Sequence, residues 1–111
     1  MKKIKYLTIL SLVAGAVSAQ AQAPAKGDPK KGKTTFDQQC SLCHDATTTE
    51  QKMGPGLKGL FKRPKLATNG KPINDANVLD KINNGGNTMT PFKDLLSDSE
   101  KADLMAYLKT I

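Results

Sequence analysis

Cys40-Ser41-Leu42-Cys43-His44 constrains this 111-residue chain more than any other segment. The C-x-x-C-H spacing is the attachment pattern of a c-type haem, because two thiols at this separation can add to the two vinyl groups of one porphyrin. The histidine after the second cysteine then lies under the iron as an axial ligand. The motif therefore predicts one haem bound covalently through Cys40 and Cys43, with His44 on the iron.

The cysteine pair could instead belong to a zinc site, a solvent-exposed disulfide or a thioredoxin-like redox pair. Structural zinc sites usually have four nitrogen or sulfur ligands, whereas the chain has two cysteines and one histidine. A thioredoxin-like pair is expected beside a βαβ unit, and no alternating strand pattern surrounds the motif. The haem interpretation is therefore favoured over the disulfide and the redox pair.

The first residues have the pattern of an export signal. Lys2, Lys3 and Lys5 precede an uncharged apolar run over 6–17, and small residues suit a cleavage site near 19–21. The run is shorter than the roughly 20 residues that span a membrane. We therefore predict a secretory signal peptide over 1–21, one domain over 22–111, and a periplasmic protein with no stable membrane insertion after cleavage.

Charge and composition limit the kinds of molecule that the exported domain is expected to bind. Removal of the three lysines in the signal lowers the formal net charge from +7 to +4 (7 − 3 = 4). A moderately basic surface suits redox proteins with acidic docking faces. Nucleic acid is not expected, since the chain has only three Phe, two Tyr and no Trp and shows no binding motif. A single small domain, monomeric and with a thin core, is expected.

Capping residues predict helices joined by long loops. Asp28 suits an N-cap and Pro29 suits the first helical position, so a helix is predicted to about Gln39 that delivers Cys40. Asn74 or Asp75 could begin a second helix, which the Asn-Gly-Gly sequence at 84–86 would end. This second helix is expected to carry the following apolar side chains inward: Val78, Leu79 and Ile82.

The C-terminal segment predicts the last helix. Ser97 and Glu100 form an S-x-x-E capping box, so a helix is expected from about Asp98 to Ile111. Prolines and glycines over 53–74 disfavour regular structure there. The fold class is therefore all-α, with three to four helices and long loops wrapped around one covalent haem.

The sixth iron ligand is expected to be a methionine, because His44 is the only histidine. Met1 leaves with the signal, and Met105 falls on an apolar helical stripe and is expected in the core. Met53 lies nine residues after His44, a link that should keep it on the histidine side of the ring. Met89 lies 45 residues beyond His44, so its loop can reach the opposite side. Met89 is therefore the predicted ligand.

Several further motifs, taken in chain order, resemble those of class I mono-haem bacterial cytochromes c. The matching stretches are Gly27-Asp28 with Gly32 and Phe36, Cys40 to His44, Lys52-Met53-Gly54-Pro55-Gly56-Leu57-Lys58-Gly59-Leu60-Phe61-Lys62-Arg63, Met89 before Pro91-Phe92, and Leu104-Met105-Ala106-Tyr107-Leu108. The resemblance covers nearly all of the chain after the signal and implies the small cytochrome c fold.

The resemblance also implies roles for individual residues. His44 and Met89 would ligate the iron, and the carbonyl of Pro55 would accept a hydrogen bond from the other ring nitrogen of His44. Arg63 would lie near a haem propionate. In the core, Phe36 would meet Tyr107 where the first and last helices cross, with Gly32 allowing the close approach.

With both axial positions filled by the chain, the expected function is one-electron transfer between respiratory partners, not catalysis. Lys52 and Lys93 are candidates for steering those partners. Two alternatives remain. An open iron could bind a diatomic gas if Met89 does not ligate it, and the domain could instead feed electrons into a multi-subunit oxidoreductase.

Overall fold

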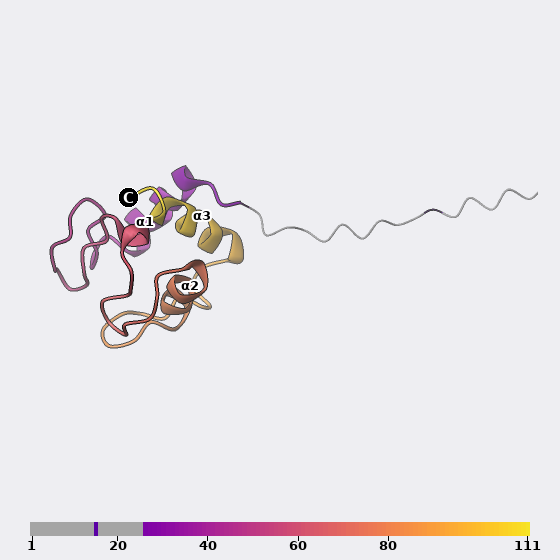
Figure 1. Cartoon of the computed structure of the whole chain (residues 1–111). Helices are drawn as coiled ribbons and strands as arrows, with labels where there is room; N and C mark the ends of the chain where they lie inside the picture. The colour runs from indigo at the N-terminus through magenta and orange to yellow at the C-terminus, as the bar shows by residue number, and fades with distance from the viewer. Residues whose placement is uncertain (1–14, 16–25) are drawn as a thin grey trace, which may run out of the picture.

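The computed structural model describes Gly15 and residues 26–111. The elements are α1 (Pro29–Gln39), the 3-10 helix η1 (Leu60–Lys62), α2 (Asp75–Asn84) and α3 (Asp98–Leu108), joined by long loops (Figure 1). Within the described residues there are no strands beyond two isolated bridges. The all-α prediction is thus confirmed. The predicted signal peptide lies, apart from Gly15, outside the described residues. In the described part of the chain no helix is long and apolar enough to cross a membrane.

Helix α1 begins where its capping residues predict. The Asp28 side chain accepts a hydrogen bond from the Lys30 amide at 2.9 Å, and Pro29 occupies the first turn. The helix ends at Gln39, with Cys40 as its C-cap. The amide of Asp28 also donates to a carboxylate oxygen of Asp103 on α3 at 2.7 Å. The start of α1 is therefore tied to the last helix.

Helices α1 and α3 cross in close contact and lie side by side in Figure 1. A Cβ placed on Gly32 would run into the backbone carbonyl of Asp103 and lie 2.8 Å from the Cβ of Tyr107. Glycine is therefore required for the observed approach. Phe36, one turn along α1, packs against the Tyr107 ring. The predicted crossing of the first and last helices is confirmed.

Helix α2 is capped by Asn74, whose side chain accepts from the Asn77 amide at 2.8 Å, and is followed by Gly85 at a φ of 59°. Of the three side chains expected to face inward, Val78 and Ile82 are buried and Leu79 is half-buried. The helix stands apart from the α1–α3 pair in Figure 1 and packs far less against α3 than α1 does.

Helix α3 has the predicted capping box, with the Ser97 hydroxyl accepting from the Glu100 amide and the Glu100 carboxylate accepting from the Ser97 amide, each at 3.1 Å. The predicted end at Ile111 was wrong, because the helix stops at Leu108. The amide and hydroxyl of Thr110 both bond to the Tyr107 carbonyl, at 2.8 and 2.6 Å, and this turn replaces helical continuation.

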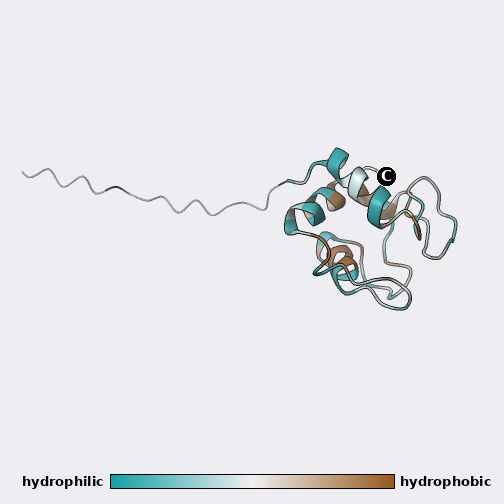
Figure 2. Ribbon diagram, turned by 180° about the vertical axis from the view of Figure 1, so that it is seen from behind, coloured by the Kyte–Doolittle hydropathy of each residue, from teal (hydrophilic) through white to brown (hydrophobic). Residues whose placement is uncertain are grey.

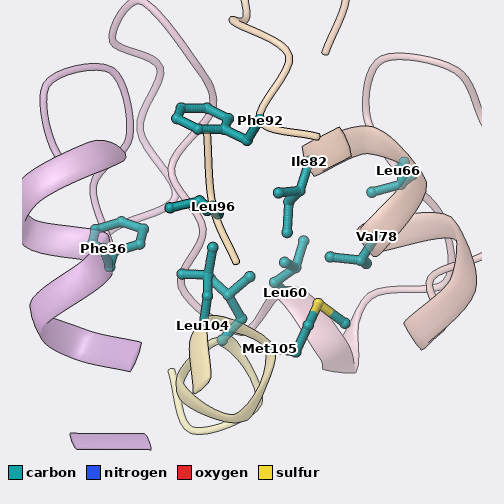
Figure 3. Close-up of a cluster of buried hydrophobic side chains, with 10 residues drawn as sticks. Phe36, Leu60, Leu66, Val78, Ile82, Phe92, Leu96, Leu104 and Met105 are labelled. Carbon is teal, nitrogen blue, oxygen red and sulfur yellow. The ribbon is translucent and has the colours of Figure 1, made fainter. Parts of the chain in front are cut away.

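The core is one cluster of ten buried hydrophobic side chains, shown in Figure 3. Four of them are Phe36, Leu96, Leu104 and Met105; the other six are Leu60, Leu66, Val78, Ile82, Phe92 and Leu108. Met105 is 8% exposed, which confirms it as a core residue. The helices carry hydrophobic stretches beside hydrophilic ones, brown and teal in Figure 2. The second group of six matters for function, because all six side chains also line a cavity.

Candidate functional site

The C-x-x-C-H motif folds as a tight turn at the end of α1. The carbonyl of Cys40 accepts from the amides of Cys43 at 3.1 Å and His44 at 3.0 Å. The Ser41 hydroxyl adds a bond to the Asp37 carbonyl at 2.6 Å. Because these bonds lie within one turn, the two thiols and the imidazole are brought together by local structure alone.

Both cysteines are free thiols and half-buried, so the alternative of a solvent-exposed disulfide finds no support in the geometry. Burial, with a smaller contribution from Cys43, raises the pKa of the Cys40 thiol to about 11. Thioredoxin-like redox pairs depend on a thiol whose pKa is lowered. The environment of Cys40 therefore also disfavours a thiol redox pair.

The ring of His44 is fixed in orientation and tautomer. Its Nδ1 lies 2.8 Å from the carbonyl oxygen of Pro55, as expected. A carbonyl only accepts, so Nδ1 carries the proton and the lone pair remains on Nε2. A Cβ on Gly54 would lie 2.8 Å from Nδ1 and 3.0 Å from Nε2, so the glycine packs directly against the ring. The amide of Gly54 bonds back to the Cys43 carbonyl at 2.8 Å. The segment after the motif thus holds the imidazole ready to bind a metal through Nε2.

These groups open into a cavity of about 400 Å³. Its walls come from the end of α1, the loops over 42–68, α2, the loop over 86–92 and the end of α3. The side chains that line it include Cys40, Cys43, His44, Met53, Leu57, Leu60, Arg63, Lys65, Leu66, Val78, Lys81, Ile82, Met89, Phe92 and Leu108. The lining is therefore mostly apolar, with two thiols, one imidazole and thioethers as its soft donors.

Met89 reaches this cavity from a turn that follows α2. The amides and carbonyls of Gly86 and Met89 bond reciprocally at 3.0 and 3.1 Å. The turn uses left-handed backbone at Gly85, Gly86 and Asn87, with φ values of 59°, 123° and 55°. Glycine adopts such angles freely and asparagine tolerates them. The Met89 side chain is half-buried against the core.

The comparisons with known proteins agree with this geometry. Residues 27–108 match the family described as cytochrome C oxidase, cbb3-type, subunit III. A cytochrome c-554 from Methylosinus trichosporium is 32% identical over 124 residues, covering 97% of this chain and 92% of that protein. Cytochrome c of Ginkgo biloba is 31% identical over 105 residues, covering 80% and 92%.

The chain is a class I cytochrome c. The fold of this cytochrome is also that of cytochrome c6 from the diatom Phaeodactylum tricornutum, with a TM-score of 0.60 at 24% identity, over 76% of this chain and 93% of that one. Membership of the family means that the cytochrome carries one c-type haem, attached through Cys40 and Cys43. It is accordingly a haem protein of electron transport.

The residues of the cavity fit this group. A flat apolar macrocycle needs hydrophobic walls, and six buried core side chains provide them. Thioether linkage needs two free thiols at the edge of the cavity, and both cysteines are there. Iron of a cytochrome c takes imidazole and thioether ligands, and the cavity lining contains both.

Arg63 also lines the cavity. One of its terminal nitrogens donates to the carbonyls of Gly56 at 2.9 Å and Lys58 at 2.6 Å. These bonds hold the guanidinium across the loop before η1. A role beside a haem propionate remains a prediction.

Several residues of the site were not expected from the sequence. Leu66 and Phe92 are buried in the cavity wall, and Lys65 and Lys81 line it as well. Lys81 lies on α2 three positions after the buried Val78, so the predicted helix could have indicated it. Leu66 lies in a loop without periodicity, and no local pattern could have indicated its burial.

The two candidate steering lysines are both exposed. The ammonium of Lys52 donates to the Ser41 carbonyl at 3.3 Å, which places it beside the cysteine motif. Lys93 lies directly after Phe92, a residue of the cavity wall. Both lysines are therefore close in the chain or in space to segments that form the haem site.

Proposed function

We propose that this cytochrome is a periplasmic carrier of single electrons between respiratory proteins, with His44 and Met89 as the axial ligands. The observation that carries the proposal is the shared cavity. A histidine whose Nδ1–H is bound to Pro55, and a methionine from a separate loop, line the same apolar space as the two thiols.

Each ligand has a defined task. His44 presents Nε2 while its bond to the Pro55 carbonyl fixes the ring and increases its donor strength. When bound, the haem supplies an iron that alternates between Fe(II) and Fe(III). Met89 offers a soft thioether, which favours Fe(II) and raises the reduction potential. Because His44 and Met89 would both hold the iron, no place would be left for a substrate, and we propose no catalytic activity.

The partners are proposed to be redox proteins with acidic docking faces. The domain over 22–111 has a formal charge of +4, and Lys52, Lys65 and Lys93 are exposed near the segments that line the cavity. Opposite charges on the two proteins increase the rate at which they meet. Complexes between electron-transfer proteins have small interfaces and are short-lived. Association rates should accordingly fall as ionic strength rises. A monomer suits this role.

Periplasmic location follows from the proposed signal peptide over 1–21. Its basic start and its apolar run support export, and an oxidising compartment is suited to the joining of haem to a cysteine pair. Expression of the full chain, followed by fractionation and N-terminal sequencing of the holoprotein, tests this. A mature protein that starts near Gln20 or Gln22 is expected in the periplasmic fraction, and a cytoplasmic protein that retains Met1 contradicts it.

The axial ligand is tested by three methionine variants. In Met89→Ala the iron should be open: the ferric protein loses the weak long-wavelength band of iron–sulfur bonding, the ferrous protein binds carbon monoxide, and the potential falls. Met53→Ala and Met105→Ala serve as controls and should retain the band. A Met89→Ala protein that keeps both its band and its potential would overturn the ligand assignment. Wild-type protein that binds carbon monoxide freely would favour the open, gas-binding alternative.

A second candidate function is that of an electron-feeding module within a larger oxidoreductase. The observation that favours it is the match of 27–108 to a family described as an oxidase subunit. Gel filtration of a native extract, followed by haem staining, separates the two. A free carrier elutes near its own mass of 11.9 kDa or below, and a module elutes with a large complex.

A further inference from the structure

Lys101 is the one charged side chain that is buried in the part of the chain that the structure describes, with 8% exposure. It lies on α3 three, four and seven positions before Leu104, Met105 and Leu108, so it shares their buried face. A buried ammonium is costly unless it is hydrogen-bonded. Its hydrogen bond should therefore identify what this lysine does.

The partner of Lys101 is the backbone of the loop between α2 and α3. Its ammonium donates to the Lys93 carbonyl at 2.9 Å. The amide of Lys93 donates to the Asn83 carbonyl at 3.1 Å, and the amide of Phe92 donates to the Ile82 carbonyl at 2.9 Å. The segment 92–93 is therefore held by α2 on one side and by Lys101 of α3 on the other.

This doubly held segment begins three residues after Met89. Met89 itself is restrained by the reciprocal bonds with Gly86. The chain between them is closely packed, since a Cβ on Gly85 would lie 2.9 Å from the nitrogen of Pro91. Movement of this loop would withdraw the Met89 sulfur from the cavity, and the bond from Lys101 opposes such movement.

We propose that Lys101 is a positioning residue for Met89. Its ammonium fixes the loop backbone at Lys93, and this keeps the thioether in the cavity. The inference rests on the proposed function, in which Met89 binds the iron. A packing role alone would need only the methylene stem of Lys101, which can fill the same space without the hydrogen bond. The proposed role needs the hydrogen bond as well.

Cyanide added to the ferric holoprotein is the probe, because it reaches the iron only when the sixth ligand leaves. Lys101→Met keeps the stem and removes the donor. It should bind cyanide about tenfold faster or more, as expected for the loss of a hydrogen bond from a charged group. Lys101→Arg restores a cationic donor and should return the rate to near that of the wild type.

Lys109→Met is the matched control. Lys109 lies just after α3 and its ammonium bonds to Asp75 at the start of α2 at 2.8 Å, far along the chain from the Met89 loop. That ion pair is exposed, so its loss should change the cyanide rate by no more than about twofold. Unfolding midpoints are measured for all variants, because a structural role alone would lower the midpoint and leave the cyanide rate unchanged.

The outcomes separate the inference from the function on which it rests. Wild-type protein that binds cyanide as fast as Met89→Ala would overturn the ligand assignment itself. Slow cyanide binding in the wild type, fast binding in Met89→Ala and a wild-type rate in Lys101→Met would overturn only the role of Lys101.

A measurement on the wild-type holoprotein applies whether or not the variants fold. Lys101 can restrain Met89 only if the backbone at 92–93 moves when the thioether leaves the iron. The amides of Phe92 and Lys93 should therefore exchange with solvent through the same opening that limits cyanide binding. Protection of both amides during openings that admit cyanide would overturn the inference.

Discussion

The rings of Phe36 and Tyr107 meet with their centroids 5.5 Å apart and their planes at 58°. This tilted contact joins α1 and α3 one turn beyond Gly32. Aromatic pairs of this geometry contribute about 0.5–1.5 kcal/mol beyond the burial of their surface. The contact also holds α1, which leads directly into Cys40, against α3.

Gly32→Val should lower the free energy of unfolding of the holoprotein by about 1–3 kcal/mol, the usual cost of overpacking. The added side chain would collide with backbone at Asp103, which cannot rotate away. Thermal or denaturant unfolding measures the effect. Lys31→Val, at an exposed position of α1, is the control for helix propensity. Equal midpoints for the two variants would show that the helices do not depend on this approach.

Met105→Ala should lower the free energy of unfolding by about 2–5 kcal/mol, because it leaves a cavity in the core. The side chain is 8% exposed and does not line the haem cavity. The long-wavelength ferric band should therefore survive. Met53→Ala, at a side chain that is 68% exposed, should change stability little. Loss of the band in Met105→Ala would contradict the division of roles among the methionines.

Gly54→Ala should disturb the proximal side of the haem. Its methyl group would press on the His44 ring and weaken the bond from Nδ1 to the Pro55 carbonyl. A weaker bond makes the imidazole a poorer donor to Fe(III), so the reduction potential should rise. Potentiometric titration measures this, with Met53→Ala as the control at the preceding position. An unchanged potential would mean that the hydrogen bond does not tune the iron.

Acidified organic solvent should leave the haem colour with the protein, because two thioether bonds hold the group. Cys40→Ala and Cys43→Ala should each reduce the yield of holoprotein, and the double variant should release its haem to the solvent. Ser41→Ala, which keeps both thiols, is the control. Complete extraction of colour from the wild type would rule out covalent attachment.

Local chemistry explains why so much of the fold could be predicted. The caps at Asp28, Asn74 and Ser97 bond to amides two or three residues away, so the sequence specified where each helix starts. The C-x-x-C-H turn is equally local. The end of α3 was harder to predict, since Thr110 competes with the helix through its own backbone and hydroxyl.

Long-range features could not be predicted from local patterns. The short helix η1 lies within a segment rich in proline and glycine, which predicted no regular structure. The burial of Lys101 depends on the Lys93 carbonyl eight residues earlier in the chain. One clue was available, because Lys101 occupies the same helical stripe as Leu104 and Leu108. A lysine on an apolar stripe is a reason to look for a buried acceptor.

Six of the ten buried hydrophobic side chains form both the core and the wall of the cavity. Before haem is attached, these six would lack the apolar surface they are shaped to cover, and only the α1–α3 crossing would keep its packing. We expect the chain to complete its folding when haem is attached, so that until then it is exposed to proteases. The cellular level of the cytochrome should therefore follow the supply of haem to the compartment where attachment occurs, even when the rate of synthesis is constant.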